Sequence, residues 1–226
     1  MLIRRSEARG QTRLSWLHSQ HTFSFGGYFE PNFMGFGNLR VINQDVVRPG
    51  AGFGQHGHRD MEIISVVMSG RLEHRDTYGH HGLIGPGEVQ VMSAGHGIAH
   101  SEYNASETDP VEFYQIWIKP NEMSLEPRYQ QAKMLNQPGL QRLVSEDGRD
   151  GSLRINQVAE LSRLRVSESL FEFRPRLQRL WLQLYKGSLS LNGHTLNPGD
   201  GVALSGHQRV QIEDAKDVDA LLINVE

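Results

Sequence analysis

The 226-residue sequence contains no cysteine, which excludes disulfides, thiolate metal sites and cysteine nucleophiles. Basic residues are not in excess either, since 23 Lys and Arg stand against 26 Asp and Glu. Without a basic stripe, we expect no direct nucleic-acid partner. No apolar run is long enough to cross a bilayer, and residues 1–16 lack the apolar core of a signal peptide. We therefore expect a cytoplasmic protein that does not contact membranes.

Helical periodicity is also scarce, whereas short alternating segments bounded by glycine and proline are frequent. Residues 111–118 (VEFYQIWI) place Val111, Phe113, Gln115 and Trp117 on one face of a predicted strand. Residues 179–187 (RLWLQLYKG) alternate in the same way, with three leucines on one face. The 24 glycines fit many tight turns. These patterns predict an all-β protein with few short helices.

Two parts of the chain resemble each other. Residues 83–97 and 195–208 share a turn of proline, glycine and an acidic residue, then a short apolar strand and a Gly-His pair. A repeat of roughly a hundred residues predicts two tandem antiparallel β-barrels of the jelly-roll type. Chance similarity between short turns is the alternative. We place the boundary in the polar, proline-containing stretch and predict domains at 1–120 and 153–226, joined by a linker at 121–152.

Two pairs of metal-binding side chains have the same spacing. His56 and His58 are separated by one residue, as are His100 and Glu102. In a strand, residues i and i+2 point to the same side with Cα atoms about 6.5 Å apart, so each pair can reach one ion. Imidazole nitrogens bind such ions at about 2.0–2.1 Å. If the two pairs lie on neighbouring strands and face inward, they form one metal site.

The composition of the candidate site limits its metal. Three neutral imidazoles and one carboxylate suit divalent iron, nickel, manganese, cobalt, copper or zinc. Octahedral geometry leaves two positions open. The competing interpretation is a set of surface histidines, because a single His-x-His is weak evidence and the chain contains 11 histidines. We interpret His80 and His81 as an exposed turn and His74 as solvated, whereas two equally spaced pairs are harder to attribute to composition.

The glycines around these pairs sharpen the pattern. Gly50-x₅-His56-x-His58-x₃-Glu62-x₇-Gly70 and, downstream, Gly97-x₂-His100-x₃-Asn104 resemble the two cupin motifs. The first motif differs by one residue before its last glycine, and the second lacks its usual proline. Among the cupins, the chain resembles the pirins, and within them bacterial pirin-like quercetin 2,3-dioxygenases. The segments HTFSFGGYF, PNFMGFGNLRVIN, HGHRDMEI, MSAGHGIAHSE and YQIWI carry this resemblance, which is dense through residue 120 and looser afterwards.

The resemblance implies roles that spacing alone leaves open. Spacing allows Glu62 to face the ion, but the pirin pattern implies that Glu102 is the fourth ligand. Glu62 then becomes a candidate acceptor that orients a histidine, or a strand carboxylate outside the site. The expected metal is iron(II), with the other divalent ions as alternatives. In the second half, alignment of Gly187 with Gly70 places Phe173 and Pro175 opposite His56 and His58. Alignment of His207 with His96 places Gln211 opposite His100, so we expect that half to bind no metal.

The resemblance also implies an activity. The expected function is oxygenolytic cleavage of a flavonol such as quercetin, with release of carbon monoxide and with Glu102 as general base. The partners are then a planar polyphenol and dioxygen, and we expect a monomer. Phe33, Met34 and Phe36 are candidates for the rim of the pocket, although such aromatic clusters more often belong to the core. Two alternatives are a metal-dependent co-regulator that binds a protein partner and a cupin enzyme with another small-molecule substrate.

Overall fold

The computed structural model describes all residues except 135–136 and 207–208, and the regular secondary structure of its described part is almost entirely β-strand. Its only helices there are two short 3₁₀ turns, η1 (Ser6–Ala8) and η2 (Arg149–Gly151). The strands form three sheets, and the predicted all-β class with two tandem halves is confirmed. Hydrogen bonds between the described strands do not close either half into a continuous barrel.

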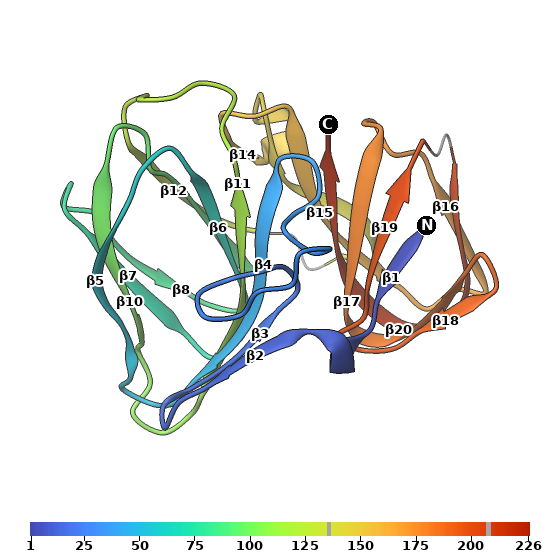
Figure 1. The fold of residues 1–226 in the computed structure, drawn as a ribbon, viewed down its shortest axis with the longest axis horizontal. Helices are drawn as coiled ribbons and strands as arrows, with labels where there is room; N and C mark the ends of the chain where they lie inside the picture. The colour runs from blue at the N-terminus through green and yellow to red at the C-terminus, as the bar shows by residue number, and fades with distance from the viewer. Residues whose placement is uncertain (135–136, 207–208) are drawn as a thin grey trace.

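The N-terminal half consists of a seven-stranded sheet, ordered β12-β9-β6-β11-β4-β3-β2, and a four-stranded sheet, ordered β5-β10-β7-β8. Every strand pair in both sheets is antiparallel. Strands β5, β7 and β10 lie at the side of this half that is far from the C-terminal half (Figure 1). The strands are β2 (Gly10–Arg13), β3 (Leu17–His21), β4 (Leu39–Val47), β5 (Gly52–His58), β6 (Glu62–Ser69), β7 (Leu72–Asp76), β8 (His81–Ile84), β9 (Glu88–Ser93), β10 (Ile98–Asn104), β11 (Val111–Ile118) and β12 (Arg128–Lys133).

The C-terminal half is a nine-stranded sheet built around two long strands, β17 and β20. Register shifts between Leu184 and Ser190 bend this pair. The bent sheet encloses an apolar core that includes Leu182, Leu189 and Leu222. Its strands are β1 (Leu2–Arg4), β13 (Gly139–Ser145), β14 (Leu153–Arg154), β15 (Ala159–Val166), β16 (Leu170–Phe173), β17 (Arg179–Leu191), β18 (His194–Leu196), β19 (Gly201–Ser205) and β20 (Val210–Val225).

The division between the halves differs from the predicted one in two places. The stretch 121–152 is not a plain linker, because it contributes β12 to the N-terminal sheet and β13 to the C-terminal sheet. The first strand, β1, pairs with β19 and therefore belongs to the C-terminal sheet. Figure 1 shows this blue strand beside the orange and red ones. The N-terminal half is therefore preceded by a strand of the C-terminal sheet, β1, and followed directly by another, β13.

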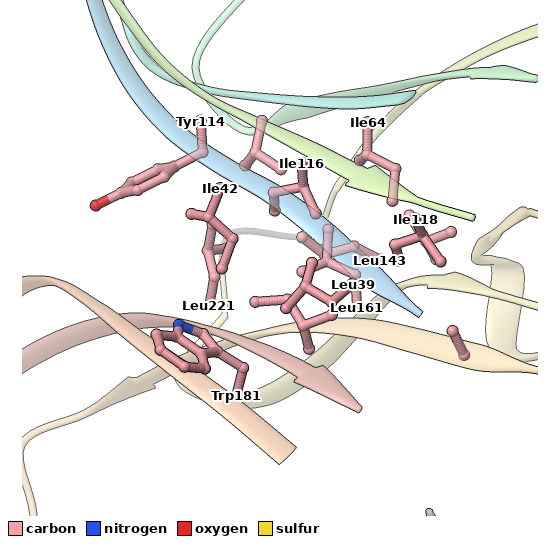
Figure 2. Packing of buried hydrophobic residues seen from close by; sticks show 14 of the residues in the cluster. Leu39, Ile42, Ile64, Tyr114, Ile116, Ile118, Leu143, Leu161, Trp181 and Leu221 are labelled. Carbon is pink, nitrogen blue, oxygen red and sulfur yellow. The ribbon is translucent and has the colours of Figure 1, made fainter. Parts of the chain in front are cut away.

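A shared apolar core joins the two halves. Strand alternation turns Tyr114 and Ile116 of β11 away from the interior of their own half and towards Trp181 and Leu221 (Figure 2). Phe23 also packs on Trp181, with ring centroids 4.9 Å apart. The alternate residues of β11 face the other way, into the N-terminal half. The seven-stranded sheet therefore turns one face into the N-terminal half, opposite the four-stranded sheet, and packs its other face against the second half.

Candidate metal centre

The two predicted ligand pairs lie on adjacent strands. In the antiparallel register of β5 and β10, His56 is opposite His100 and His58 is opposite Ile98. The register shifts between His100 and Glu102, so β5 bulges just before His56. Gly52 allows the close approach of the strands here, because a Cβ at this position would lie 2.2 Å from the carbonyl oxygen of Glu102. The register and the bulge together bring the side chains of His56, His58 and His100 close to one another.

The three imidazoles form a compact cluster. One nitrogen from each of His56, His58 and His100 lies within 4.8 Å of the others, and the Nε2 atoms of His58 and His100 are 3.0 Å apart. Two nitrogens that bind one ion at about 2.0–2.1 Å and at a right angle are about 3.0 Å apart. The observed spacing thus fits adjacent positions of an octahedral site. The donor set fits a divalent transition metal.

Hydrogen bonds fix which nitrogen faces the cluster. Nδ1 of His56 donates to the carbonyl oxygen of Gly54 at 2.8 Å, which leaves Nε2 with a free lone pair. On the other strand, Nε2 of His74 lies 3.2 Å from Oδ2 of Asp76, and Nδ1 of His74 lies 3.3 Å from Nδ1 of His100. Because a carboxylate only accepts, His74 donates to Asp76 and accepts from His100. This chain leaves Nε2 of His100 free to bind a metal.

Burial keeps His58 and His100 neutral. Desolvation, followed by repulsion from His100 and His56, lowers the pKa of His58 to about 4. Desolvation, followed by repulsion from His56 and His74, lowers the pKa of His100 to about 3. Neutral imidazole is the form that binds metals, so these two side chains need not release a proton at neutral pH.

Glu102 is buried beside the histidines and is held by two donors. Oε1 accepts from Ser65 Oγ at 3.1 Å, and Oε2 accepts from Gln115 Nε2 at 2.7 Å. Gln115 is itself held by Trp117, whose Nε1 donates to Gln115 Oε1 at 3.2 Å. Glu102 forms a second close group with His74 and His100, within 4.8 Å. Its carboxylate is therefore fixed next to the histidine that both groups share.

One sequence prediction needs correction here. His74, predicted to be solvated, is fully buried on β7 and supports His100. Burial alone would raise the pKa of Asp76 beneath it, but hydrogen bonds from His74 and His80 lower it below the usual range.

For Glu62, two alternatives were open. Its carboxylate is buried and accepts from Ser93 Oγ at 2.7 Å and Asn156 Nδ2 at 3.0 Å. These contacts match the second alternative, a strand carboxylate outside the site.

A cavity of about 550 Å³ opens beside the cluster, within the range of small-molecule sites. His56, His58 and Glu102 contribute to one part of its wall. Four aromatic residues also line it: Trp16, Phe25, Phe53 and Trp117. Trp117 stands edge-on to His58, with ring centroids 4.9 Å apart. The cavity therefore combines a metal-binding wall with flat apolar walls.

The predicted rim residues lie elsewhere. None of Phe33, Met34 and Phe36 lines the cavity. Phe36 packs on Trp181 in the shared core, Phe33 lies under the Arg4 guanidinium, and Met34 is exposed. Phe25, from the same aromatic stretch, does line the cavity. It packs edge-on against Trp117 of β11, which is distant in sequence, so composition alone could not select it.

In the part of the chain that the structure describes, both potential metal-binding groups belong to the N-terminal half. Phe173 and Pro175 line a separate cavity of the second half, and Gln211 is hydrogen-bonded to Glu172. The sequence alignment that places Gln211 opposite His100 uses His207, which lies outside the described residues. The described residues also include no helix long and apolar enough to span a membrane.

Comparison with known proteins identifies the family. A family model described as Pirin matches residues 3–118, and one described as Quercetinase C-terminal cupin domain matches residues 142–225. A quercetin 2,3-dioxygenase of Escherichia coli K12 is 43% identical over 99% of this chain and 97% of its own. The chain belongs to the pirin family. A putative quercetin 2,3-dioxygenase of Pasteurella multocida is 38% identical to this pirin over 99% of the chain and 98% of its own.

Solved structures support the same relationship. The bacterial pirin YhhW of Escherichia coli, crystallised in complex with nickel(II), superposes on this pirin with a TM-score of 0.95. The two chains are 42% identical, and the match covers 99% of this pirin and 98% of YhhW. The similarity thus extends over both halves and includes the strands that carry the histidine cluster.

Proposed function

We propose that this pirin is a metal-dependent dioxygenase that cleaves flavonols such as quercetin, with release of carbon monoxide. The observation that carries the proposal is the three-histidine cluster on the wall of an aromatic cavity of about 550 Å³. Two relatives of nearly equal length bear the name quercetin 2,3-dioxygenase, one of them as putative. The cavity offers what a planar polyphenol needs, namely flat apolar walls and a few fixed polar groups.

In this proposal, His56, His58, His100 and Glu102 hold the metal. We propose iron(II) as the native ion, while the nickel(II) complex of YhhW supports a site of this type that also accepts nickel. When bound, the metal supplies a Lewis acid that lowers the pKa of a hydroxyl group next to it. His58 and His100 stay neutral throughout, because burial holds their pKa values far below 7.

Glu102 has a second role, as the base that takes the proton of the flavonol 3-hydroxyl group. Its two oxygens are held by Ser65 and Gln115, which fix the carboxylate against the cavity. A base must lie within hydrogen-bonding reach of the proton it removes, and a fixed carboxylate meets this requirement without reorganisation. The aromatic walls orient the flavonol ring and exclude water from it. The resulting electron-rich ring is the partner for dioxygen.

The test is dioxygen uptake by iron(II)-loaded protein supplied with quercetin. The proposal predicts uptake, loss of flavonol absorbance and release of carbon monoxide. His58→Ala removes one of the two nitrogens that lie 3.0 Å apart, so we expect loss of bound metal and of uptake together. His194→Ala is the matched control, because His194 is an exposed histidine of β18 in the other half. It should retain both properties.

Two results would contradict the proposal. Metal-loaded protein that binds iron through the cluster but consumes no dioxygen with flavonols is not a flavonol dioxygenase, and the two alternatives are then a metal-dependent co-regulator and a cupin enzyme with another small-molecule substrate. Full turnover by metal-free His58→Ala protein would show that the cluster does not carry the reaction.

A further inference from the structure

Asp45 lies on the cavity wall but has no part in the metal cluster. It belongs to β4, where Ser19 of β3 and Phe113 of β11 are its register neighbours. Ile42 of the same strand points into the core shared by the two halves. Because strand side chains alternate, Asn43 and Asp45 point the opposite way, and both line the cavity.

The carboxyl group of Asp45 is buried with one oxygen unpaired. The residue is 4% exposed, and Oδ1 has no hydrogen-bond partner. Among the residues that line the cavity, no other side-chain nitrogen or oxygen is both fully buried and without a partner. His21 is bonded to Thr12 and Asn43, each at 2.8 Å, and both oxygens of Glu102 accept hydrogen bonds. A buried acceptor without a partner is destabilising, so its retention in a cavity points to a ligand that supplies the donor.

The chemistry of the surroundings narrows the ligand class. Burial, opposed by Ser19 and reinforced by the charge of Glu102, raises the pKa of Asp45 to about 7. Near neutral pH the group is therefore present in both forms, and each form has an oxygen that accepts from a hydroxyl group. Trp16, Phe25 and Phe53 provide flat contacts beside it. A hydroxyl group attached to a planar ring fits this combination.

We propose that Asp45 determines specificity in this cavity: its unpaired oxygen accepts a hydrogen bond from a ring hydroxyl of a polyphenol held against the metal site. This inference rests on the proposed function, since the polyphenol is the proposed substrate. It adds to that function a reason to prefer polyhydroxylated flavonols over those that carry only the metal-binding 3-hydroxyl group. A site built to bond a substrate hydroxyl rejects analogues that lack it.

The experiment compares two ligands without turnover. Iron(II)-loaded protein is titrated under anaerobic conditions with quercetin and with 3-hydroxyflavone, which keeps the 3-hydroxyl and the neighbouring carbonyl but lacks the other hydroxyls. Wild type should bind quercetin more tightly. Asp45→Leu keeps the branched shape and removes the acceptor, so it should weaken quercetin binding about tenfold to a hundredfold. Binding of 3-hydroxyflavone should change less than about twofold, because that ligand has no hydroxyl group for Asp45.

Two further variants guard against structural artefacts. Asp45→Asn retains an acceptor oxygen in the same shape and should keep part of the selectivity, even if Asp45→Leu does not fold. Glu112→Gln alters a carboxylate of β11 that accepts from Gln44 and Tyr185 rather than lining the cavity, and it should leave both affinities unchanged.

The failures of the two proposals can be told apart. If wild type binds both flavonols in a metal-dependent way and Asp45→Leu weakens both equally or neither, Asp45 is not a specificity residue, whereas the proposed function stands. If Asp45→Leu cannot be obtained folded, equal loss of both affinities in Asp45→Asn has the same meaning. If wild type binds no flavonol, the proposed function and this assignment are both overturned.

Discussion

Single buried groups control the properties of this cavity, and Asp45 shows how. Its pKa rises from the ordinary value of 3.8 to about 7, with burial as the largest cause, so the folded metal-free protein holds this proton more firmly than the unfolded chain. Because the pKa is raised on folding, the contribution of Asp45 to the free energy of unfolding is fully present below pH 3.8. It is lost as the pH rises through about 7.

Asp45→Asn removes this titration and should therefore become more stable relative to wild type as the pH rises from 4 to 8. The gain should reach at most roughly 4 kcal/mol, the free energy equivalent of the pKa change. Urea denaturation of both metal-free proteins across this pH range measures it, and all other titrating groups cancel in the difference. A difference that stays constant with pH would show that Asp45 ionises normally in the folded state.

Residues of the site differ in how far sequence could predict them. His56, His58 and His100 were identified because a strand places i and i+2 on one side, and that rule needs no tertiary information. The role of His74 could not be predicted in this way, because it has no histidine two residues away. Its partners are Asp76 and His100, and His100 is 26 residues away in the sequence. Asp45 was missed for a similar reason, since its neighbours Ser19 and Phe113 come from two other strands.

At the scale of elements, strand β7 supports the metal-binding strand β10. The register places His74 opposite Glu102 and Asp76 opposite His100, so each proposed ligand of β10 has a polar neighbour on β7. His74 stacks on Tyr129 of β12, with ring centroids 4.7 Å apart. This packing locks the acceptor nitrogen that orients His100.

His74→Phe should keep the packing on Tyr129 but remove the acceptor for Nδ1 of His100. We expect metal affinity to fall about tenfold to a hundredfold, the usual effect of losing a residue that orients a ligand. Competition with a chelator of known affinity measures the change. His81→Phe is the control, since His81 is an exposed histidine of the neighbouring strand β8 that contacts Glu73 instead. Equal affinity in wild type and His74→Phe would mean that β7 does not position the ligand.

Strands β11 and β12 differ in how well their sequences predict them. The faces of β11 follow the predicted alternation, because each face packs against apolar groups. Strand β12 has no such pattern, since its first five residues are all partly exposed and its sixth is exposed. Its pairing with β9 is set by backbone hydrogen bonds, which any residue except proline can form, so a polar linker was the expectation there.

At the scale of the whole molecule, the second half stabilises the first through its apolar face. Trp181 of β17 is almost fully buried and contacts Phe23 and Phe36 of the other half. The same core includes Ile116 and Tyr114, which lie on the outer face of the strand that carries Gln115, the donor to Glu102. The half without a metal-binding group among its described residues thus holds the sheet behind the metal centre.

Trp181→Ala should therefore affect the distant metal site. Removing a buried tryptophan costs about 3–5 kcal/mol, and the shared core predicts that both halves lose this stability together. Heating the metal-loaded protein while following far-ultraviolet circular dichroism and metal release tests this. We expect both midpoints to fall by the same amount, and to stay unchanged in the exposed-site variant His194→Ala. If the dichroism midpoint falls while metal release keeps its wild-type temperature, the halves unfold independently and the shared core does not couple them.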